Sequence, residues 1–141
     1  MQTFLPHKEF DVTATCLDRQ RLGKQRIEAK QIYNVLDGKS KGWANHPAVL
    51  MWKGYERALC LYGASICMEW RRRGYKDRQL DWFLDRMGHG PIKFPPWMGN
   101  EKFHASHRAA LLAKQPDHYN QFEWKEEPAI NYWWPTKEGS Q

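Results

Sequence analysis

Apolar residues recur at helical spacing in separate stretches of the chain, and this periodicity restricts it to a mainly helical fold. In the first stretch, four apolar side chains fall on one side of a predicted helix: Leu22, Ala29, Tyr33 and Leu36. The turn-forming residues of DGKSKG follow, so we expect the first main helix to span residues 18–36. Asp11 is placed to cap a short turn before it, which ends at Cys16.

The second stretch is longer and predicts a helix that begins at Asn45 or His46 and runs to Trp70. One side of this helix carries apolar residues at helical spacing: Leu50, Tyr55, Leu59, Tyr62 and Ile66. Pro47 suits the first helical turn, where a backbone N–H would have no helical partner. This helix should therefore be the longest element of the fold.

Three glycines in this region have different expected roles. Gly74 follows the three arginines of RRRG, whose charges complement the negative end of the helix dipole, and it suits the left-handed conformation that ends helices. Gly54 and Gly63 lie inside the predicted helix. We interpret both as positions that allow a neighbouring helix to approach closely, and not as breaks.

Two further helices and a tail complete the predicted fold. DRQLDWFLDRMG predicts a short inserted helix capped by Asp77, and the loop GHGPIKFPPWMGN follows it. Asn100 should cap a third main helix that Pro116 ends. The stretch after residue 120 has no period and is rich in aromatic residues. The predicted fold class is all-α: a compact single domain over residues 1–141, with three main helices, the short inserted helix and an aromatic C-terminal tail.

Composition excludes several classes of protein. The chain has 141 residues, of which 41% are apolar, enough to bury one core. No apolar run approaches the roughly 18–20 residues of a membrane-spanning helix, and MQTFLPHKEF lacks the regions of a signal peptide. Cys16, Cys60 and Cys67 are odd in number and suit buried thiols better than a disulfide framework. We expect a cytoplasmic, monomeric protein with no membrane contact.

The charge pattern indicates a polyanionic partner. The formal net charge is +6, and the cations cluster in residues 19–30 and 71–78 instead of spreading evenly. Eight Trp, six Tyr and six Phe exceed what a small core needs, and aromatic planes beside a cationic surface suit unstacked bases. A basic protein with a Trp-rich core and no nucleic-acid partner is the plainer alternative.

One carboxylate stands among the cations of the first helix. Arg21, Lys24, Glu28 and Gln31 fall on one side of it at helical spacing. The residues leave two interpretations open. Glu28 either forms an ordinary surface ion pair with Lys24, or it is placed where the neighbouring cations grip a sugar–phosphate backbone.

Three segments carry a resemblance to a known family. LDRQRLGKQRIEA, HPAVLMWKGYERALCLYGASICMEWRRRGYKD and EKFHASHRAALLAKQPDHY follow one another in an order that resembles the pyrimidine dimer DNA glycosylases of the phage endonuclease V type. The resemblance covers about residues 1–36, 46–77 and 101–134. It implies a compact all-α fold and a cofactor-free reaction, in which excision of a base from duplex DNA is followed by cleavage of the abasic site.

The resemblance also implies which groups react. By position, the family's catalytic glutamate falls on Glu28, and its nucleophile, an N-terminal α-amine, falls on Met1, which the bulky Gln2 should leave in place. Arg21 stands where the phage enzyme has a histidine. The arginine keeps a positive charge at this position, but the titrating group of the histidine is lost. An α-amine titrates near pH ~7.7–8.0 and a lysine near ~10.4, so more of the α-amine is neutral and nucleophilic at pH ~7.

Ten residues are expected to hold the DNA backbone, some from the charge pattern and others from the resemblance: Arg19, Arg21, Lys24, Arg26, Arg71, Arg72, Arg73, His104, His107 and Arg108. The three arginines that end the second helix can equally serve as partners of its dipole. The two histidines can equally form a polar helix surface. No Cys, Asp or Glu at matching spacing completes a metal-binding set with them, so we expect no metal site.

Four residues are expected to line the pocket for the base: His46, Tyr132, Trp133 and Trp134. The histidine precedes a proline and can instead be a helix cap or a core hydrogen-bonding group. The aromatic tail can seal the core, or it can stack on an opened lesion as the family's aromatic C-terminus does. We expect its rings to divide between these two roles.

The predicted function is DNA base-excision repair. A glycosylase with β-elimination lyase activity would act on damaged or modified pyrimidines in duplex DNA, through an imine to the N-terminal amine. Two alternatives remain open: a non-catalytic helical module that binds DNA or RNA, and a glycosylase of the same fold that removes a hypermodified pyrimidine. A free, neutral N-terminal amine distinguishes the enzyme from the binding module.

Overall fold

The computed structural model describes residues 1–135, so the last part of the predicted tail lies outside the described residues. Residues 1–135 contain helices and no strand, which confirms the all-α class. No helix in this range has the length and apolar character needed to cross a membrane. The elements are α1 (Phe10–Cys16), α2 (Arg19–Leu36), α3 (Pro47–Leu50), α4 (Glu56–Arg72), α5 (Leu80–Met87), α6 (Glu101–Lys114), α7 (Pro116–Tyr119) and the 3-10 helix η1 (Asn120–Phe122).

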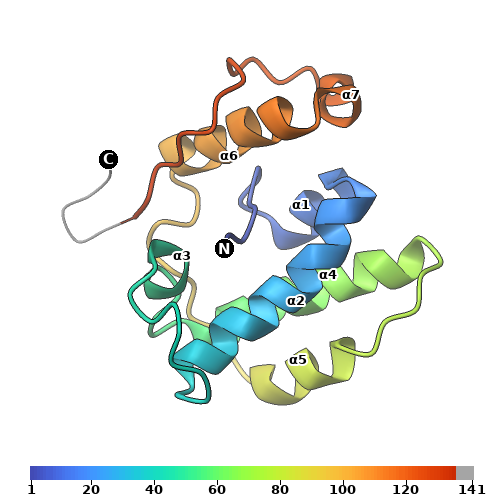
Figure 1. The fold of residues 1–141 in the computed structure, drawn as a ribbon. Coiled ribbons are helices and arrows are strands. Elements are labelled where there is room, and N and C mark those ends of the chain that lie inside the picture. The colour runs from blue at the N-terminus through green and yellow to red at the C-terminus, as the bar shows by residue number, and fades with distance from the viewer. Residues whose placement is uncertain (136–141) are drawn as a thin grey trace.

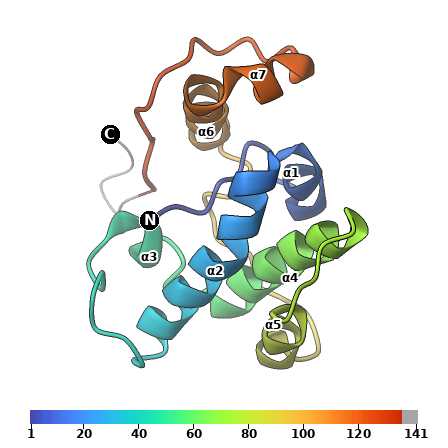
Figure 2. The ribbon, with the colours of Figure 1, turned by 45° about the vertical axis from the view of Figure 1, so that its right-hand side comes forward.

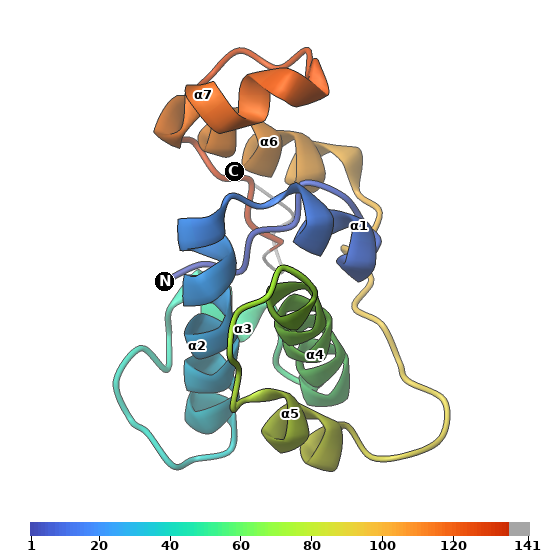
Figure 3. The same cartoon turned by 90° about the vertical axis from the view of Figure 1, so that its right-hand side faces the viewer.

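The helices enclose the N-terminal segment from two sides. On one side α2 packs against α4, and α1 and α5 both pack on α4. On the other side lie α6 and α7, as Figures 1 and 2 show. Figure 3 gives the same arrangement from the side, with the chain between α5 and α6 running along one edge of the molecule. The N-terminal segment therefore lies between two groups of helices.

The first and third main helices begin where the sequence predicts, because their caps are in place. Asp18 is the N-cap of α2 and accepts the backbone N–H of Arg21 at 3.3 Å. The hydroxyl of Tyr119 donates to the same carboxylate at 2.5 Å, which ties α7 to the start of α2. Asn100 caps α6 and accepts the backbone N–H of Lys102 at 2.9 Å.

The prediction of one continuous second helix is wrong. Turns at residues 51–54 separate α3 from α4, and Gly54 there has a φ of +88°. A residue in this left-handed region cannot continue a right-handed helix, so Gly54 is a break and not a site of close packing. The break lets Trp52 turn into the core, where its indole N–H donates to the Thr3 hydroxyl at 3.0 Å.

The region is also not the longest element, since α4 has 17 residues and α2 has 18, but the predictions for Gly63, Gly74 and the two cysteines are confirmed. A Cβ built at Gly63 would lie 2.4 Å from the ring of Phe83 in α5, so this glycine does allow close helix packing. Gly74 follows α4 with a φ of +97° and ends the helix as expected. Cys60 and Cys67 are buried in the core, and burial raises the pKa of both thiols.

Gly63→Ala should lower the free energy of unfolding by about 1–3 kcal/mol, because the added methyl group overlaps the Phe83 ring in a packed core. Gly42→Ala is the matched control, since nothing lies within 4 Å of a Cβ at that loop position. Its stability should change by less than ~0.5 kcal/mol. Urea denaturation of the two variants and the parent measures both effects. Equal stability of all three proteins would contradict the close packing of α4 on α5.

Candidate active site

The N-terminal segment, residues 1–6, is the feature around which the candidate site forms. It has no strand beside it among the described residues, yet Gln2, Thr3, Phe4 and Leu5 are buried. Buried backbone groups need hydrogen-bond partners, and side chains of α2, α4 and α6 supply them here. These bonds determine where the first residue of the chain lies.

Gln25 of α2 binds this segment as a neighbouring strand would. Its side-chain carbonyl accepts the N–H of Phe4 at 3.0 Å, and its amide donates to the carbonyl of Gln2 at 3.0 Å. The hydroxyl of Tyr62 in α4 lies 2.7 Å from both the Phe4 carbonyl oxygen and Gln25 Oε1. Burial raises the pKa of Tyr62, so its hydroxyl keeps the proton that it donates.

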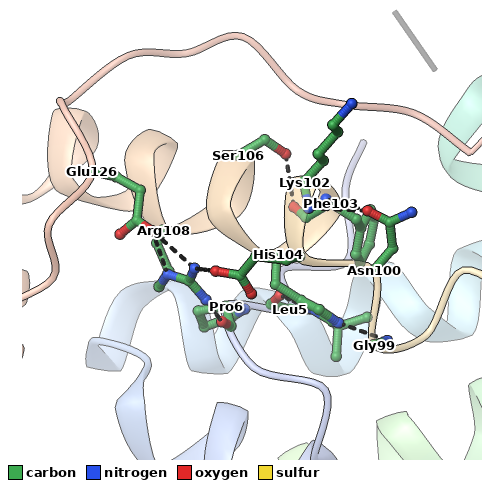
Figure 4. A network of polar contacts seen from close by, with 11 residues as sticks. Leu5, Pro6, Gly99, Asn100, Lys102, Phe103, His104, Ser106, Arg108 and Glu126 are labelled. Carbon is green, nitrogen blue, oxygen red and sulfur yellow. Dashed lines mark hydrogen bonds and ion pairs between the residues drawn. The ribbon is translucent and has the colours of Figure 1, made fainter.

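Two histidines of α6 hold Leu5 from the other side of the segment. Nδ1 of His107 accepts the N–H of Leu5 at 2.9 Å. Nε2 of His104 accepts the N–H of Gly99 at 3.0 Å, so His104 carries its proton on Nδ1 and donates it to the Leu5 carbonyl at 2.7 Å. Figure 4 shows the His104 part of this network, with the side chain directed toward Leu5.

Arg108 belongs to the same network and not to a free surface. Its guanidinium donates to a backbone carbonyl of the N-terminal segment and pairs with Glu101 and Glu126, at 2.5 and 2.8 Å (Figure 4). The residues His104 and His107 are 3% and 0% exposed. The prediction that these two histidines contact DNA is therefore wrong, because both are buried against the N-terminal segment. Arg108 is occupied by protein partners in this structure.

Glu28 lies at the open end of the segment. The backbone N–H of Gln2 donates to Glu28 Oε1 at 3.3 Å. A cavity of about 330 Å³ adjoins this contact and is lined by residues of the segment, α2, α6 and the tail: Met1, Gln2, Phe4, Gln20, Arg21, Lys24, Gln25, Glu28, Lys114, Ile130 and Tyr132. The structure thus brings together Met1 and Glu28, the two residues that the resemblance marks as catalytic.

Three cationic side chains line this cavity, and two of them have no acidic partner among the residues that the structure describes. Arg21 pairs with Asp18 at 3.3 Å. Lys24 and Lys114 form no ion pair within residues 1–135, and neither does Arg19, which is exposed on the same helix as Lys24. Their positive charge remains available to an anionic ligand such as a phosphate.

Four other predicted DNA contacts take part in ion pairs: Arg26, Arg71, Arg72 and Arg73. Asp77 binds the first two, and Glu69 binds the last two at 2.6 and 2.8 Å. Hydrogen bonds from Arg72 and Arg73 lower the pKa of Glu69, so this carboxylate stays ionised. None of the four lines the cavity beside Glu28. The pair of Arg26 with Asp77 links α2 to the segment that follows α4, whereas the pairs of Glu69 lie within the end of α4.

The predicted base-pocket residues divide between two roles. His46 is the N-cap of α3, which confirms its capping role, and its ring lies edge-on to Trp134 at 5.9 Å. Tyr132 lines the cavity beside Glu28. Trp133 instead packs on α6, where its backbone N–H donates to the Ser106 hydroxyl at 3.1 Å. The described part of the tail both covers the helices and lines the candidate site.

Sequence analysis missed several residues that line or support the cavity. The sequence could have indicated Gln25, because it lies three residues before Glu28 and therefore on the same side of the helix. No pattern in the sequence indicated Lys114 or Ile130, because only tertiary packing brings α6 and the tail to α2. The role of Gln2, whose backbone touches Glu28, was also not visible in the sequence.

A comparison with protein-family models agrees with this geometry. The model of the pyrimidine dimer DNA glycosylases matches residues 1–82 of the chain. The chain belongs to the pyrimidine dimer DNA glycosylase family. Searches of the curated proteins and of the solved structures gave no significant match. Family membership supports a role as a DNA repair glycosylase with DNA as its substrate, and the matched range contains Met1, Glu28 and His46.

The buried, neutral His107 makes the stability of this glycosylase depend on pH. Burial lowers the pKa of His107 to about 3 from an ordinary value of 6.5. Below pH 6.5 the unfolded chain binds a proton that the folded chain excludes, so the free energy of unfolding should fall as the pH drops toward about 3. The limiting slope for one such group is ~1.4 kcal/mol per pH unit.

Denaturant titrations of the parent and of His107→Asn over this pH range test the prediction. The Asn carbonyl can still accept the N–H of Leu5 but does not titrate, so the variant should lose less stability on acidification. Parallel loss of stability in both proteins would show that His107 is not the group responsible.

Proposed function

We propose that this chain excises a damaged or modified pyrimidine from duplex DNA and then cleaves the abasic site by β-elimination. The α-amine of Met1 is the nucleophile and Glu28 is the carboxylate that assists both steps. One observation carries the proposal: the backbone that leads to Met1 is hydrogen-bonded to Glu28 at 3.3 Å, and both residues line one cationic cavity.

The chemistry requires an amine and a carboxylate on the same sugar. The neutral amine attacks C1′, and the glycosidic bond breaks with its electron pair passing to the departing base. The attached nitrogen then loses a proton, and its lone pair forms a C=N bond as the C1′–O4′ bond breaks and O4′ takes up a proton, which leaves an iminium. Glu28 stabilises the positive charge that develops on the sugar and then accepts the C2′ proton, and the bond between C3′ and the phosphate oxygen breaks.

The cations around the cavity favour a phosphate backbone as the ligand. Lys24 comes from α2 and Lys114 from the end of α6, so the two lie on opposite groups of helices and both line the space beside Glu28. Arg21 adds a third positive charge, partly compensated by Asp18. A sugar–phosphate chain bound by these residues brings a deoxyribose to Met1 and Glu28.

Glu28→Gln should reduce strand cleavage by about a hundred- to ten-thousandfold, because the amide can neither accept the C2′ proton nor stabilise a positive charge. DNA binding should persist or strengthen, since the change removes a negative charge that faces phosphate. Gln can still accept the N–H of Gln2, so the fold should be preserved. Cleavage and binding of duplexes that each carry one lesion or one modified pyrimidine measure both effects and identify the substrate.

Glu127→Gln is the matched control, because Glu127 is exposed and has no ion-pair partner among the described residues. It should cleave like the parent. Full cleavage by Glu28→Gln, or loss of DNA binding without loss of turnover, would contradict the catalytic assignment.

A further inference from the structure

A second cavity, of about 230 Å³, adjoins the first residue of the chain. Its lining comes from that residue, the C-terminal half of α2 and the loop that follows α2: Met1, Gln31, Asn34, Val35, Ser40 and Trp43. The side chains of this lining carry no charge, whereas three cations and Glu28 line the first cavity. Met1 lines both cavities, so a cationic space and a neutral space meet at the residue that we propose as the nucleophile.

Helix α2 sets the order of the two cavities. Four of its residues follow one another at spacings of four, three and four, which places them on one side of the helix: Lys24, Glu28, Gln31 and Val35. The first two line the first cavity and the last two line the second. A ligand that lies along this side of α2 therefore meets a cation, then the carboxylate, and then the neutral space about 4.5 Å further along the helix axis.

The polar groups of the second cavity are available to a ligand. Within residues 1–135 the side-chain amides of Gln31 and Asn34 and the hydroxyl of Ser40 form no hydrogen bond with the protein. Each amide offers both a donor and an acceptor, and the hydroxyl does the same. The edge of a pyrimidine carries carbonyl and N–H or amino groups that need such partners when the base leaves the duplex.

Trp43 adds an aromatic plane to this cavity. The residue is 61% exposed although its side chain is large and apolar, and its backbone has a φ of +69°, which is strained for a bulky residue. Its carbonyl accepts the N–H of His46 at 2.9 Å, which ties the loop to the start of α3. Strained residues concentrate at functional sites, and an exposed indole suits stacking on an unstacked base.

The size and position of the second cavity suit one pyrimidine ring. A protein cavity of about 150 Å³ accepts benzene, so a volume of about 230 Å³ has room for a six-membered ring with its carbonyl oxygens. The base and the phosphates are joined to the same sugar. With the phosphates held near Lys24 and the sugar beside Glu28, the neutral space next to Met1 is within reach of the base.

We propose that the second cavity binds the pyrimidine that is excised, with the indole of Trp43 stacked on its ring and the amides of Gln31 and Asn34 hydrogen-bonded to its edge. This inference rests on the proposed function and names the site that holds the base. These side chains form and break no covalent bond. When the glycosidic bond breaks, its electron pair passes to the base, the amide donors face the carbonyl oxygens that gain charge, and the base later takes a proton from water.

Two substitutions of Trp43 and one of Asn34 test the assignment. Trp43→Asn removes the ring but suits the backbone, because asparagine adopts a positive φ more readily than most residues. Trp43→Phe keeps an aromatic plane at the same position. Asn34→Ala removes one of the amides and leaves the ring of Trp43 unchanged.

The experiment measures single-turnover rates on three duplexes of the same sequence. The first carries one thymine dimer opposite normal bases. The second carries the same dimer opposite a strand that lacks the two facing bases, and the third has a preformed abasic site in place of the dimer. A site for the excised base matters on the first two duplexes only, because the third has no base to hold.

Trp43→Asn should excise the dimer about ten- to a hundredfold more slowly than the parent on both of the first two duplexes, and cleave the abasic duplex within about twofold of the parent. Trp43→Phe should recover most of the lost rate. Asn34→Ala should show a smaller loss that is again confined to the two dimer duplexes. Retained cleavage of the abasic duplex demonstrates that each variant is folded.

Three results would overturn the inference. Equal losses on dimer and abasic duplexes would mean that Trp43 acts on the amine or on the DNA backbone. A loss that disappears when the facing bases are absent would assign the cavity to the opposite strand, and unchanged rates on all three duplexes would remove the site altogether. If the parent protein itself fails to excise the dimer, the proposed function falls and this inference with it, so the two failures are distinguishable.

Discussion

The structure depends on the burial of an extended N-terminal segment whose backbone is hydrogen-bonded by side chains. Gln25 binds it from α2, while His104 and His107 bind it from α6. A buried donor or acceptor that loses its partner costs about 1–3 kcal/mol, so the segment and these side chains must fold together. The position of residue 1 is therefore coupled to the packing of helices that are far apart in the sequence.

This coupling places Met1 at the boundary between two chemically different cavities. The larger one contains Glu28 and the cations Lys24 and Lys114, which have no ion-pair partner within residues 1–135, and the smaller one presents amides and Trp43. A nucleotide has the same division, with an anionic backbone on one side of the sugar and a planar base on the other. In the proposed complex with DNA, residue 1 would therefore lie beside the sugar.

Local signals in the sequence predicted α2 and α6 well, because the caps Asp18 and Asn100 depend only on adjacent residues. The break at Gly54 escaped prediction, because apolar spacing continues across it while only the backbone conformation changes. The buried histidines were mistaken for surface groups for a different reason. The partner of His107 is the backbone of Leu5, 102 residues away, and no periodic pattern within α6 indicates such a contact.

The central claim is that the α-amine of Met1 is the nucleophile, and trapping of the covalent intermediate tests it most directly. Borohydride added during turnover on lesion-containing DNA should reduce the iminium to a stable protein–DNA adduct. Proteolysis and mass spectrometry should then locate the adduct on the amine of Met1. An added residue before Met1 should abolish trapping while DNA binding persists, because an amide nitrogen is not nucleophilic. An adduct on Lys24 or Lys114, or undiminished trapping by the extended protein, would contradict the account.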